Sequence, residues 1–539
     1  MLAKVKSGAL IGVDAVVVEV EVDMTMGLPY FNVVGLPDGA VKESKVRVIS
    51  ALKNSGYELP QKRITVNLAP ADIRKEGAAF EVPIALGVLA SAGLLNAQSL
   101  QPWLFGGELS LDGTVKPIRG VLPLALAARD GGFKGVMVPA ANAGEAALVD
   151  RIEVIPVRHF SEVVRHLNGE AALANHTRSA SGELEGSDGR GELDMSDVRG
   201  QQEVKDAIEL AAAGGHNILL CGPPGSGKTM LARRLATILP ALTFQEALEV
   251  TKVYSVLGLL NDGDGLIRDR PYRSPHHTIS DAGLVGGGPL ARPGELSMAH
   301  RGVLFLDELP EFRKHVLEVL RQPLEEGVVR LARANQNVTY PCQVMLVAAM
   351  NPCPCGWFKV KGRDCRCAPN RIVDYHGRVS GPMLDRIDIT LETRPVQIDD
   401  VATVQPSGNP SQWYRARVEA ARARQRHRFR EYPGVYCNAQ MGPRQMREHC
   451  QLGAEAKAEL VRAVTRFGLS ARAHDRILKL ALTRADLHDR DGILLEDVLV
   501  AIGCRVIDRK NWLAAPDNFS QRYLDKAQEA QIAGVGKKS

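Results

Sequence analysis

The chain has 539 residues, of which 45% are apolar and 24% are charged, and its formal net charge is +5. Such a chain can form two to four domains with large cores, and a charge this small does not by itself indicate nucleic acid. The nine cysteines are scattered except for one group, which argues against a disulfide framework. Because no signal-peptide pattern and no membrane-length apolar run is visible, the sequence predicts a cytoplasmic protein with no membrane partner.

Residues 1–168 form the first predicted unit. Alternation of apolar and polar residues predicts strands at Val16–Val22 and Arg63–Leu68, and helical spacing predicts helices at Lys42–Ser55 and Val82–Leu95. Strand-like and helix-like segments continue to alternate toward the end of the unit. The pattern predicts an α+β or α/β domain of its own.

The segment Gly106–Pro139, with KEGAAFEVPIALGVLASAG upstream of it, resembles the proteolytic domain of Lon-type proteases. That family carries a nucleophilic serine after an acid–glycine pair and a lysine after a later glycine pair, and the matching positions here are Ala79 and Leu122. A serine–lysine dyad needs the hydroxyl and the amine that activates it, and neither is present. The resemblance therefore implies a scaffold or docking domain without protease activity.

Residues 169–194 are rich in small, polar and acidic residues and contain almost no large apolar side chain. Such a segment cannot bury enough apolar surface to offset the entropy lost on ordering. We expect a flexible linker here, followed by a second unit from residue 195.

The second unit contains a phosphate-binding pattern, GPPGSGKT, between a buried strand at Asn217–Cys221 and a helix at Met230–Leu239. In this pattern glycines let backbone N–H groups point at phosphate oxygens, while the positive end of the helix dipole faces the anion. Lys228 is expected to reach the outer phosphates and the Thr229 hydroxyl to bind Mg²⁺. The pattern predicts nucleoside triphosphate binding at Gly222, Pro223, Pro224, Gly225, Ser226, Gly227, Lys228 and Thr229.

Two further strands end in polar residues suited to hydrolysis. Val303–Leu306 is followed by two acids, of which Asp307 is expected to hold Mg²⁺ through water and Glu308 to act as general base. The strand Val344–Met350 is followed by Asn351, which can orient the attacking water or simply begin the turn that the next proline demands. A long irregular stretch at residues 262–297 lies between the phosphate-binding loop and these strands, and its length predicts a functional loop. We interpret its adjacent histidines, His276 and His277, as polar loop residues rather than a pair of metal ligands.

Four cysteines follow Asn351 within fifteen residues, at Cys353, Cys355, Cys365 and Cys367. Four thiolates so close together predict tetrahedral zinc. The CxC pairs depart from the commoner CxxC spacing, so free thiols and an iron–sulfur site remain alternatives.

Two patterns of basic residues are typical of DNA contacts. Val328–Ala332 and Val338–Pro341 predict a β-hairpin with Arg330 and Arg333 near its turn. Residues 413–430 hold seven arginines and one acid, and a helix would align most of these arginines into a stripe suited to a phosphate backbone. A solvated helix face explains the stripe equally well.

Residues 195–506 resemble the magnesium-chelatase-like AAA+ ATPases. The resemblance rests on GPPGSGKT, GVLFLDELPEF, the hairpin before VMLVAAMNP, GPMLDRIDI and LSARAHDRILKLALTRADL. With the Lon-like domain and the cysteine insert, the chain is similar to the ComM/YifB group in particular. The resemblance implies a multidomain α/β fold: a Lon-like α+β domain, an AAA+ P-loop core at 195–400 with a cysteine-rich insert at 351–369, a helical lid at 401–510 and a tail at 511–539.

The resemblance also implies roles for single residues. Arg386 matches the arginine finger that enters a neighbour's site, Arg472 matches the lid sensor, and the hairpin with Arg333 would face a central pore. The finger implies a homo-oligomeric ring, a hexamer in similar helicases. The cofactors would be ATP and Mg²⁺, with Zn²⁺ at the cysteines, and the expected activity is that of an ATPase and DNA helicase or branch-migration factor, acting on single-stranded or branched DNA in recombination during natural transformation.

Two other functions stay open. A magnesium-chelatase-type motor for metal insertion or for a protein client has a similar ATPase core, and an ATP-regulated scaffold would need no hydrolysis. The complete acid pair and the finger argue against the scaffold. The cysteine insert and the arginine stripe favour DNA over a porphyrin.

Overall fold

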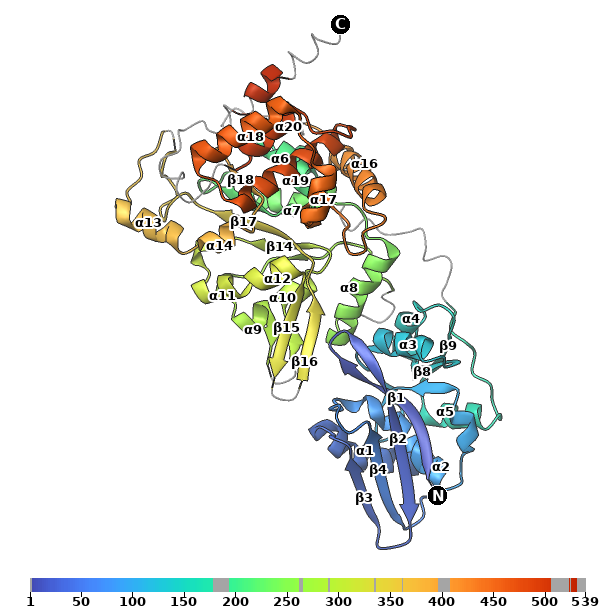
Figure 1. Cartoon of the computed structure of the whole chain (residues 1–539). Coiled ribbons are helices and arrows are strands. Elements are labelled where there is room, and N and C mark those ends of the chain that lie inside the picture. Colours follow the sequence, from blue (N-terminus) through green and yellow to red (C-terminus); the bar gives the residue numbers. More distant parts are fainter. Residues whose placement is uncertain are drawn as a thin grey trace.

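The computed structural model describes residues 2–177, 193–260, 265–288, 291–333, 336–360, 362–395, 408–505, 523 and 525–530, with only the backbone at 333 and 336. An N-terminal sheet domain lies against a larger α/β core, and helices from the C-terminal part cover one side of that core (Figure 1). The predicted mixed α/β fold with a parallel core sheet and a helical C-terminal region is confirmed.

The N-terminal domain is built on a mixed seven-stranded sheet in the order β3-β4-β2-β1-β5-β8-β9. Its strands are β1 (Ala3–Ile11), β2 (Asp14–Thr25), β3 (Tyr30–Val34), β4 (Arg63–Ala69), β5 (Trp103–Phe105), β8 (Gly135–Pro139) and β9 (Glu153–Val157), with a small hairpin of β6 (Glu108–Leu109) and β7 (Val115–Lys116). Its helices are α1 (Gly39–Asn54), α2 (Glu81–Ser91), α3 (Val121–Asp130), α4 (Ala143–Ala146) and α5 (Phe160–Leu167). Every residue of the apolar helix α2 is buried, so α2 is the centre of this domain's core.

Sequence reasoning missed several elements here and misjudged one helix end. Strands β1, β3 and β9 and helix α5 were not predicted, and α2 ends at Ser91, four residues before the predicted Leu95. The first part of the expected linker packs on the domain, because Asn175 Oδ1 accepts from Val154 N at 2.8 Å and His176 N donates to Val154 O at 2.7 Å. Residues 178–192 of that segment lie outside the described part.

The larger α/β core has a five-stranded sheet in the order β11-β14-β17-β10-β18, in which every neighbouring pair is parallel. Its strands are β10 (Ile218–Cys221), β11 (Tyr272–Arg273), β14 (Val303–Leu306), β17 (Met345–Met350) and β18 (Ile389–Glu392). Because all strands run the same way, their carboxyl ends share one edge, where ligands of open parallel sheets bind, and their amino ends share the other. We call these the carboxyl edge and the amino edge.

Helices and two hairpins complete the core. The helices are α6 (Gln202–Gly214), α7 (Lys228–Ile238), α8 (Phe244–Leu257), α9 (Asp281–Leu284), α10 (Glu295–Met298), α11 (Lys314–Val319), α12 (Arg321–Glu326), α13 (Pro369–Gly377) and α14 (Gly381–Leu384). The hairpins are β12 (Gly286–Gly287) with β13 (Arg292–Pro293), and β15 (Val328–Arg333) with β16 (Gln336–Pro341). The predicted hairpin before β17 is thus present.

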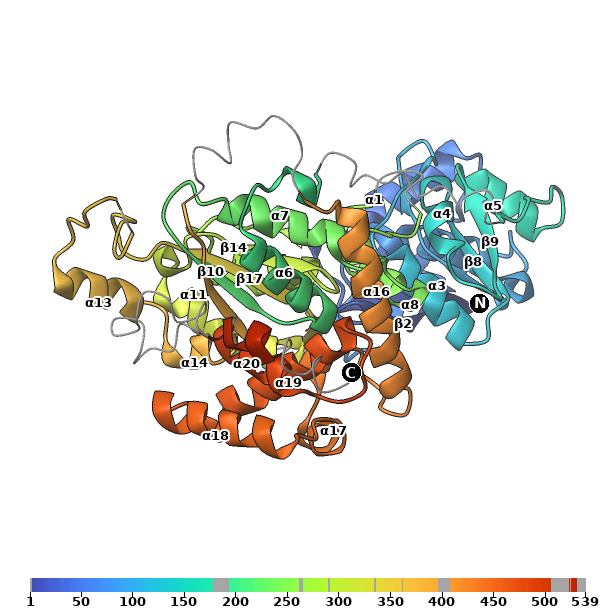
Figure 2. The ribbon, with the colours of Figure 1, turned by 90° about the horizontal axis from the view of Figure 1, so that it is seen from above.

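The C-terminal helices pack on the core through α6. They are α16 (Ser411–Arg428), α17 (Pro443–His449), α18 (Ala454–Phe467), α19 (Ala471–Leu487) and α20 (Leu495–Gly503). Helices α16 and α19 contact α6, and their apolar side chains share one core cluster with the sheet. Figure 2 shows α17 to α20 together on one side of the sheet. Within the expected tail, Tyr523 packs edge-on against Phe467, with ring centroids 6.2 Å apart.

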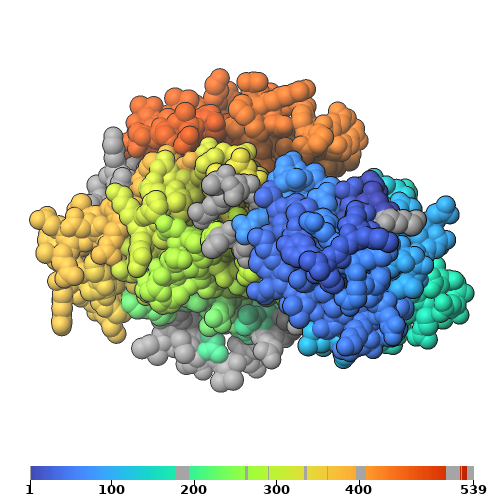
Figure 3. All heavy atoms as spheres, turned by 90° about the horizontal axis from the view of Figure 1, so that it is seen from below, coloured from blue at the N-terminus to red at the C-terminus, as the bar shows by residue number. Residues whose placement is uncertain are grey.

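Helix α8 connects the two units. Ser255 donates a hydrogen bond to the buried carboxylate of Glu145, and Gly120 N donates to Ser255 O at 3.0 Å. Leu248 of α8 is buried in the apolar cluster formed by α3 and its neighbours. The N-terminal domain forms a separate lobe in contact with the core (Figure 3), and α8 is one element through which the two units can influence each other.

Candidate nucleotide site

The predicted phosphate-binding loop lies between β10 and α7, at the carboxyl edge. Gly225 and Gly227 have φ of 77° and 80°, in the left-handed region where a side chain is strained, so these positions need glycine. Gly222 N donates to Met350 O at 3.1 Å, and the Ser226 and Thr393 hydroxyls are 2.7 Å apart. The loop is therefore fastened at its start and in its middle to the ends of neighbouring strands.

Lys228 points into the loop that precedes it. Its Nζ donates to the carbonyls of Gly222 and Pro223 at 2.8 and 2.9 Å and lies 3.3 Å from Asn351 Oδ1. Burial lowers the pKa of the ammonium group, while the carboxylates of Asp307 and Glu308 oppose that shift. A buried cation at a helix N-terminus is suited to a multiply charged anion such as a triphosphate.

The first acid of the pair lies beside the loop. Thr229 Oγ1 donates to Asp307 Oδ2 at 2.8 Å, which joins the start of α7 to the end of β14. A hydroxyl and a carboxylate side by side are the hard oxygen ligands that Mg²⁺ takes in phosphate sites. These residues fit the implied magnesium ion.

Glu308 has a contact that sequence reasoning did not foresee. Its backbone lies in the left-handed region at φ 52°, which is unusual for a residue other than glycine, and its Oε2 lies 3.4 Å from His277 Nδ1. His276 stacks on His277 with ring centroids 4.1 Å apart and bonds Thr278 instead. The length of the loop predicts a functional segment, but only the fold shows which histidine approaches Glu308.

The four cysteines of the insert come together. The Sγ atoms of Cys353, Cys355 and Cys365 are 3.3 to 3.7 Å apart, and all four sulfurs, including that of Cys367, lie within 4.8 Å of one another. Tetrahedral zinc with Zn–S bonds of about 2.3 Å requires sulfurs about 3.8 Å apart. Phe358 N also donates to Cys353 Sγ at 3.3 Å, which suits a thiolate. The residues fit a zinc ion.

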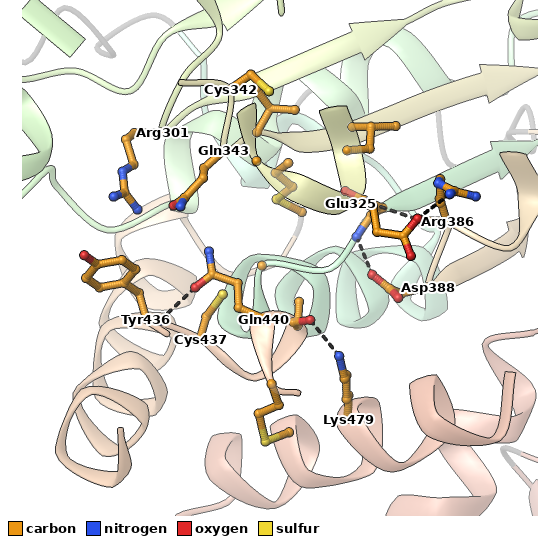
Figure 4. Close-up of a pocket in the computed structure, with 18 of the residues that line it drawn as sticks. Arg301, Glu325, Cys342, Gln343, Arg386, Asp388, Tyr436, Cys437, Gln440 and Lys479 are labelled. Carbon is orange, nitrogen blue, oxygen red and sulfur yellow. Dashed lines mark hydrogen bonds and ion pairs between the residues drawn. The ribbon is translucent and has the colours of Figure 1, made fainter. Parts of the chain in front are cut away.

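The two arginines of the expected finger and sensor lie at the amino edge. Arg386 precedes β18, donates to Arg321 O at 2.7 Å and pairs with Glu325 (Figure 4). Arg472 Nη2 lies 4.0 Å from the other carboxylate oxygen of Glu325. Both line a cavity of about 540 Å³, whereas Lys228 is at the carboxyl edge. The structure thus brings the two arginines together and keeps them away from this chain's own phosphate-binding loop.

The hairpin arginines differ in how far the structure describes them. The side chain of Arg330 is 61% exposed and pairs with Glu326. Arg333 ends β15, and its side chain lies outside the described part. The other strand of the hairpin, β16, contacts the N-terminal domain. Gly12 of that domain packs so closely on β16 that a Cβ on Gly12 would lie 3.0 Å from Thr339 O.

Most arginines of the predicted stripe are bound within the chain. Arg417 pairs with Glu209, Arg424 with Asp489, and Arg428 with the fully buried carboxylate of Asp486. Two others donate to backbone carbonyls of the core, Arg415 to Thr237 and Arg422 to Ala212. Five of the seven arginines therefore hold α16 in place, and the stripe does not support DNA binding.

The two Lon-like positions have different surroundings. Ala79 lines a cavity of about 440 Å³ between the N-terminal domain and the core. Leu122 is fully buried in the core around α3, and its N–H donates to Glu145 Oε1 at 2.8 Å. Neither side chain offers a hydroxyl or an amine, so the cavity lacks the serine–lysine dyad.

Among the described helices, none is long and apolar enough to cross a bilayer.

The parallel sheet, the P-loop, the acids after β14 and the helical C-terminal region define an ATPase of the AAA+ class. Family comparisons agree: residues 194–401 match the magnesium chelatase subunit ChlI model, residues 408–505 its C-terminal model, and residues 20–142 a further model for subunit ChlI of Mg-chelatase. Membership of this class implies ATPase activity with ATP and Mg²⁺.

Relatives that match nearly the whole chain identify the family within this class. The chain is 41% identical over 509 residues to "Competence protein ComM" of Haemophilus influenzae, covering 94% of this chain and 98% of that protein. It is 41% identical over 512 residues to "Uncharacterized protein YifB" of Escherichia coli, with the same coverage. Lon protease 2 of Bacillus subtilis is 33% identical over 125 residues, 23% of this chain and 22% of that protease. The chain belongs to the ComM/YifB family of magnesium-chelatase-like AAA+ proteins, with a Lon-like N-terminal domain.

Proposed function

We propose that the protein is an ATP-driven motor that forms a homo-hexameric ring and remodels single-stranded or branched DNA, as a helicase or branch-migration factor in natural transformation. The proposal of an ATP-driven motor rests on one observation: Lys228, Thr229, Asp307 and Glu308 lie together at one edge of the sheet. The relative from Haemophilus influenzae is named a competence protein, which supports the link to natural transformation.

In this proposal, five side chains at the carboxyl edge act in ATP hydrolysis. Lys228 binds the outer phosphates. Thr229 and Asp307 would hold Mg²⁺, which neutralises charge on the phosphates. Glu308 accepts the proton of the attacking water, and Asn351, 3.3 Å from Lys228 Nζ, orients that water.

The ring is proposed from the place of the arginines. Arg386 and Arg472 share the amino edge, where they can act only on the nucleotide of another subunit. Cationic groups that stabilise the charge on a transferring phosphoryl group are often supplied in trans. Arg472 therefore serves in this proposal together with Arg386 at the neighbour's nucleotide, rather than at its own.

DNA is the partner that the hairpin favours. Arg330 is exposed in the middle of β15, opposite Thr339 of β16, and Arg333 is the last residue of β15 before the turn. With most arginines of the stripe bound within the chain, the exposed arginine of the hairpin carries the DNA proposal. A motor for a protein client or for metal insertion is the alternative, because it would use the same nucleotide site.

The experiment is ATP hydrolysis by the purified protein with and without single-stranded, duplex and four-way-junction DNA, beside Glu308→Gln. We expect DNA to stimulate hydrolysis and Glu308→Gln to abolish it while ATP still binds, because only the general base is lost. Stimulation should also fall steeply as salt rises, since phosphate contacts release counterions.

Arg330→Ala and Arg378→Ala make a matched pair for the hairpin. Both arginines are exposed and ion-paired to a glutamate, but Arg378 pairs with Glu311, away from the hairpin. Only Arg330→Ala should reduce the stimulation by DNA. Hydrolysis that is indifferent to every DNA would replace the helicase proposal with a motor for another client.

We further propose that Cys353, Cys355, Cys365 and Cys367 hold one structural Zn²⁺, as their sulfur spacing supports. Metal analysis of the purified protein should find about one zinc per chain. Replacing zinc with Co²⁺ should give the visible absorption of a tetrahedral thiolate site. Iron with sulfide, or a metal-free protein with four reactive thiols, would overturn this assignment.

A further inference from the structure

We propose that the cysteine insert braces the phosphate-binding loop, so that metal binding at the cysteines raises the affinity for nucleotide. The inference rests on the zinc site proposed above but not on DNA as the partner. The insert lies at the opposite end of the core from the N-terminal domain, next to α13 (Figure 2).

The contact is between Gly356 and Pro224. Gly356 is buried, has φ 84°, and a Cβ on it would lie 2.5 Å from Pro224 Cδ and 2.8 Å from Cγ. The glycine therefore touches the ring of the proline, and no larger residue fits. Pro224 is the third residue of the GPPGSGKT loop, so this contact reaches the nucleotide site directly.

The same glycine belongs to the cysteine cluster. It follows Cys355 in the chain, and its N–H donates to Cys353 O at 2.9 Å. The position of Gly356 is thus fixed by two of the four sulfur-bearing residues. A metal ion that joins these cysteines to Cys365 and Cys367 fixes the surface that Pro224 rests on.

The root of the insert reaches the nucleotide site a second time. Asn351, two residues before Cys353, has its Oδ1 3.3 Å from Lys228 Nζ. Pro352 lies between Asn351 and Cys353 in the sequence, and its carbonyl oxygen accepts a hydrogen bond from His376 Nε2 of α13 at 2.8 Å. The insert therefore touches the phosphate-binding loop at Pro224 and the lysine through Asn351.

The described part of the insert lacks regular secondary structure. From residue 351 to residue 368 its described residues form neither helix nor strand. Irregular segments that close around a structural metal generally lose their fold when the metal leaves. Loss of the metal would then free Gly356, and with it the support of Pro224.

Two glycines of the insert allow a matched test. Gly356 and Gly362 both have positive φ, 84° and 82°, so alanine at either position costs the same backbone strain. A Cβ on Gly362 meets nothing within 4 Å, whereas one on Gly356 meets Pro224. The measurements are binding of a fluorescent ATP analogue and zinc content for both variants.

We expect Gly356→Ala to keep its zinc and bind the ATP analogue about tenfold more weakly, because overpacking displaces the loop. Gly362→Ala should bind nucleotide like the unmodified protein. Equal affinity of Gly356→Ala and the unmodified protein would overturn the proposal, as would an equal loss in both variants.

A second arm of the test keeps the proposal testable if Gly356→Ala loses its zinc. Stripping zinc from the unmodified protein with a chelator should weaken binding of the ATP analogue, and adding Zn²⁺ back should restore it. A stripped protein that binds nucleotide with full affinity would overturn the proposal. Both arms measure nucleotide binding and zinc, without DNA, so failure of the DNA proposal would leave them unaffected.

Discussion

At the scale of single residues, the contact between His277 and Glu308 is the most informative one in the nucleotide site. The two side chains are 3.4 Å apart, and Glu308 has a backbone conformation that is costly for a residue with a Cβ. Strain of this kind persists when surrounding contacts require it. We infer that His277 positions the carboxylate of Glu308, the proposed general base.

We expect His277→Ala to lower kcat for ATP hydrolysis by about tenfold with little change in KM, because proton transfer depends on where the base is held. His277→Asn keeps a hydrogen-bond donor and should recover part of the rate. Steady-state kinetics on both variants, with a nucleotide-binding control, make the measurement.

His276→Ala is the control, since His276 bonds Thr278 at 2.9 Å instead of Glu308. A purely structural role for the loop would make both alanine variants equally slow and would leave His277→Asn as slow as His277→Ala. Equal rates for His277→Ala and the unmodified protein would show that Glu308 needs no such support.

At the scale of elements, α16 shows how far a charge pattern can mislead. The stretch 413–430, most of which lies in α16, has seven arginines and one acid, which is typical of a surface for DNA and also of a solvated face. In the fold, Arg428 lies against Asp486, whose side chain is fully buried, and Arg417 against Glu209, which is 7% exposed. Buried carboxylates need such partners because an unpaired buried charge is strongly destabilising.

The hairpin β15–β16 and helix α8 are elements that link function to the N-terminal domain. The turn between β1 and β2 packs on β16, and α8 carries Ser255 against Glu145. Burial raises the pKa of Glu145, and hydrogen bonds from Ser255 and from the backbone oppose the shift. The Lon-like domain is thus in contact with the element proposed to meet DNA.

At the scale of the whole molecule, the two edges of the core sheet divide the chemistry. Lys228 and Glu308 lie at the carboxyl edge, and Arg386 lies at the amino edge. In the proposed ring, a head-to-tail contact between identical subunits places the amino edge of one beside the carboxyl edge of the next; such contacts form a closed ring when the rotation between subunits closes.

Mixing two inactive variants tests this arrangement. Arg386→Ala and Glu308→Gln should each abolish hydrolysis, and a 1:1 mixture should recover about a quarter of the activity. The quarter arises because a site works only when an intact Glu308 meets an intact Arg386 from the neighbouring subunit. ATP turnover after mixing is the measurement.

Arg378→Ala, a change in an exposed ion pair with Glu311, should stay active alone and serves as the control. Variants that assemble together yet stay inactive after mixing would refute a site shared between subunits. Activity of Arg386→Ala by itself would refute the role of the finger.

The sequence by itself determined the parts that depend on neighbouring residues. A glycine-rich turn between an apolar strand and a helix specifies a phosphate-binding loop locally, and the strands that end at Asp307 and Asn351 can be recognised from their own composition. The four cysteines lie so close in the chain that their meeting could also be predicted. Strands β1 and β9 were missed, and they are held by pairing with β2 and β8.

Only the tertiary structure decided which distant residues meet. Gly356 packs on Pro224, and His277 lies 3.4 Å from Glu308. Arg386 and Arg472 both lie next to Glu325 at the amino edge. No local pattern marks these contacts, because each joins segments whose relative position is set by strand order and by the parallel direction of the sheet. The physical reason is that spacing along a chain fixes the chemistry of a motif, whereas packing of the whole fold fixes the neighbours on which that motif acts.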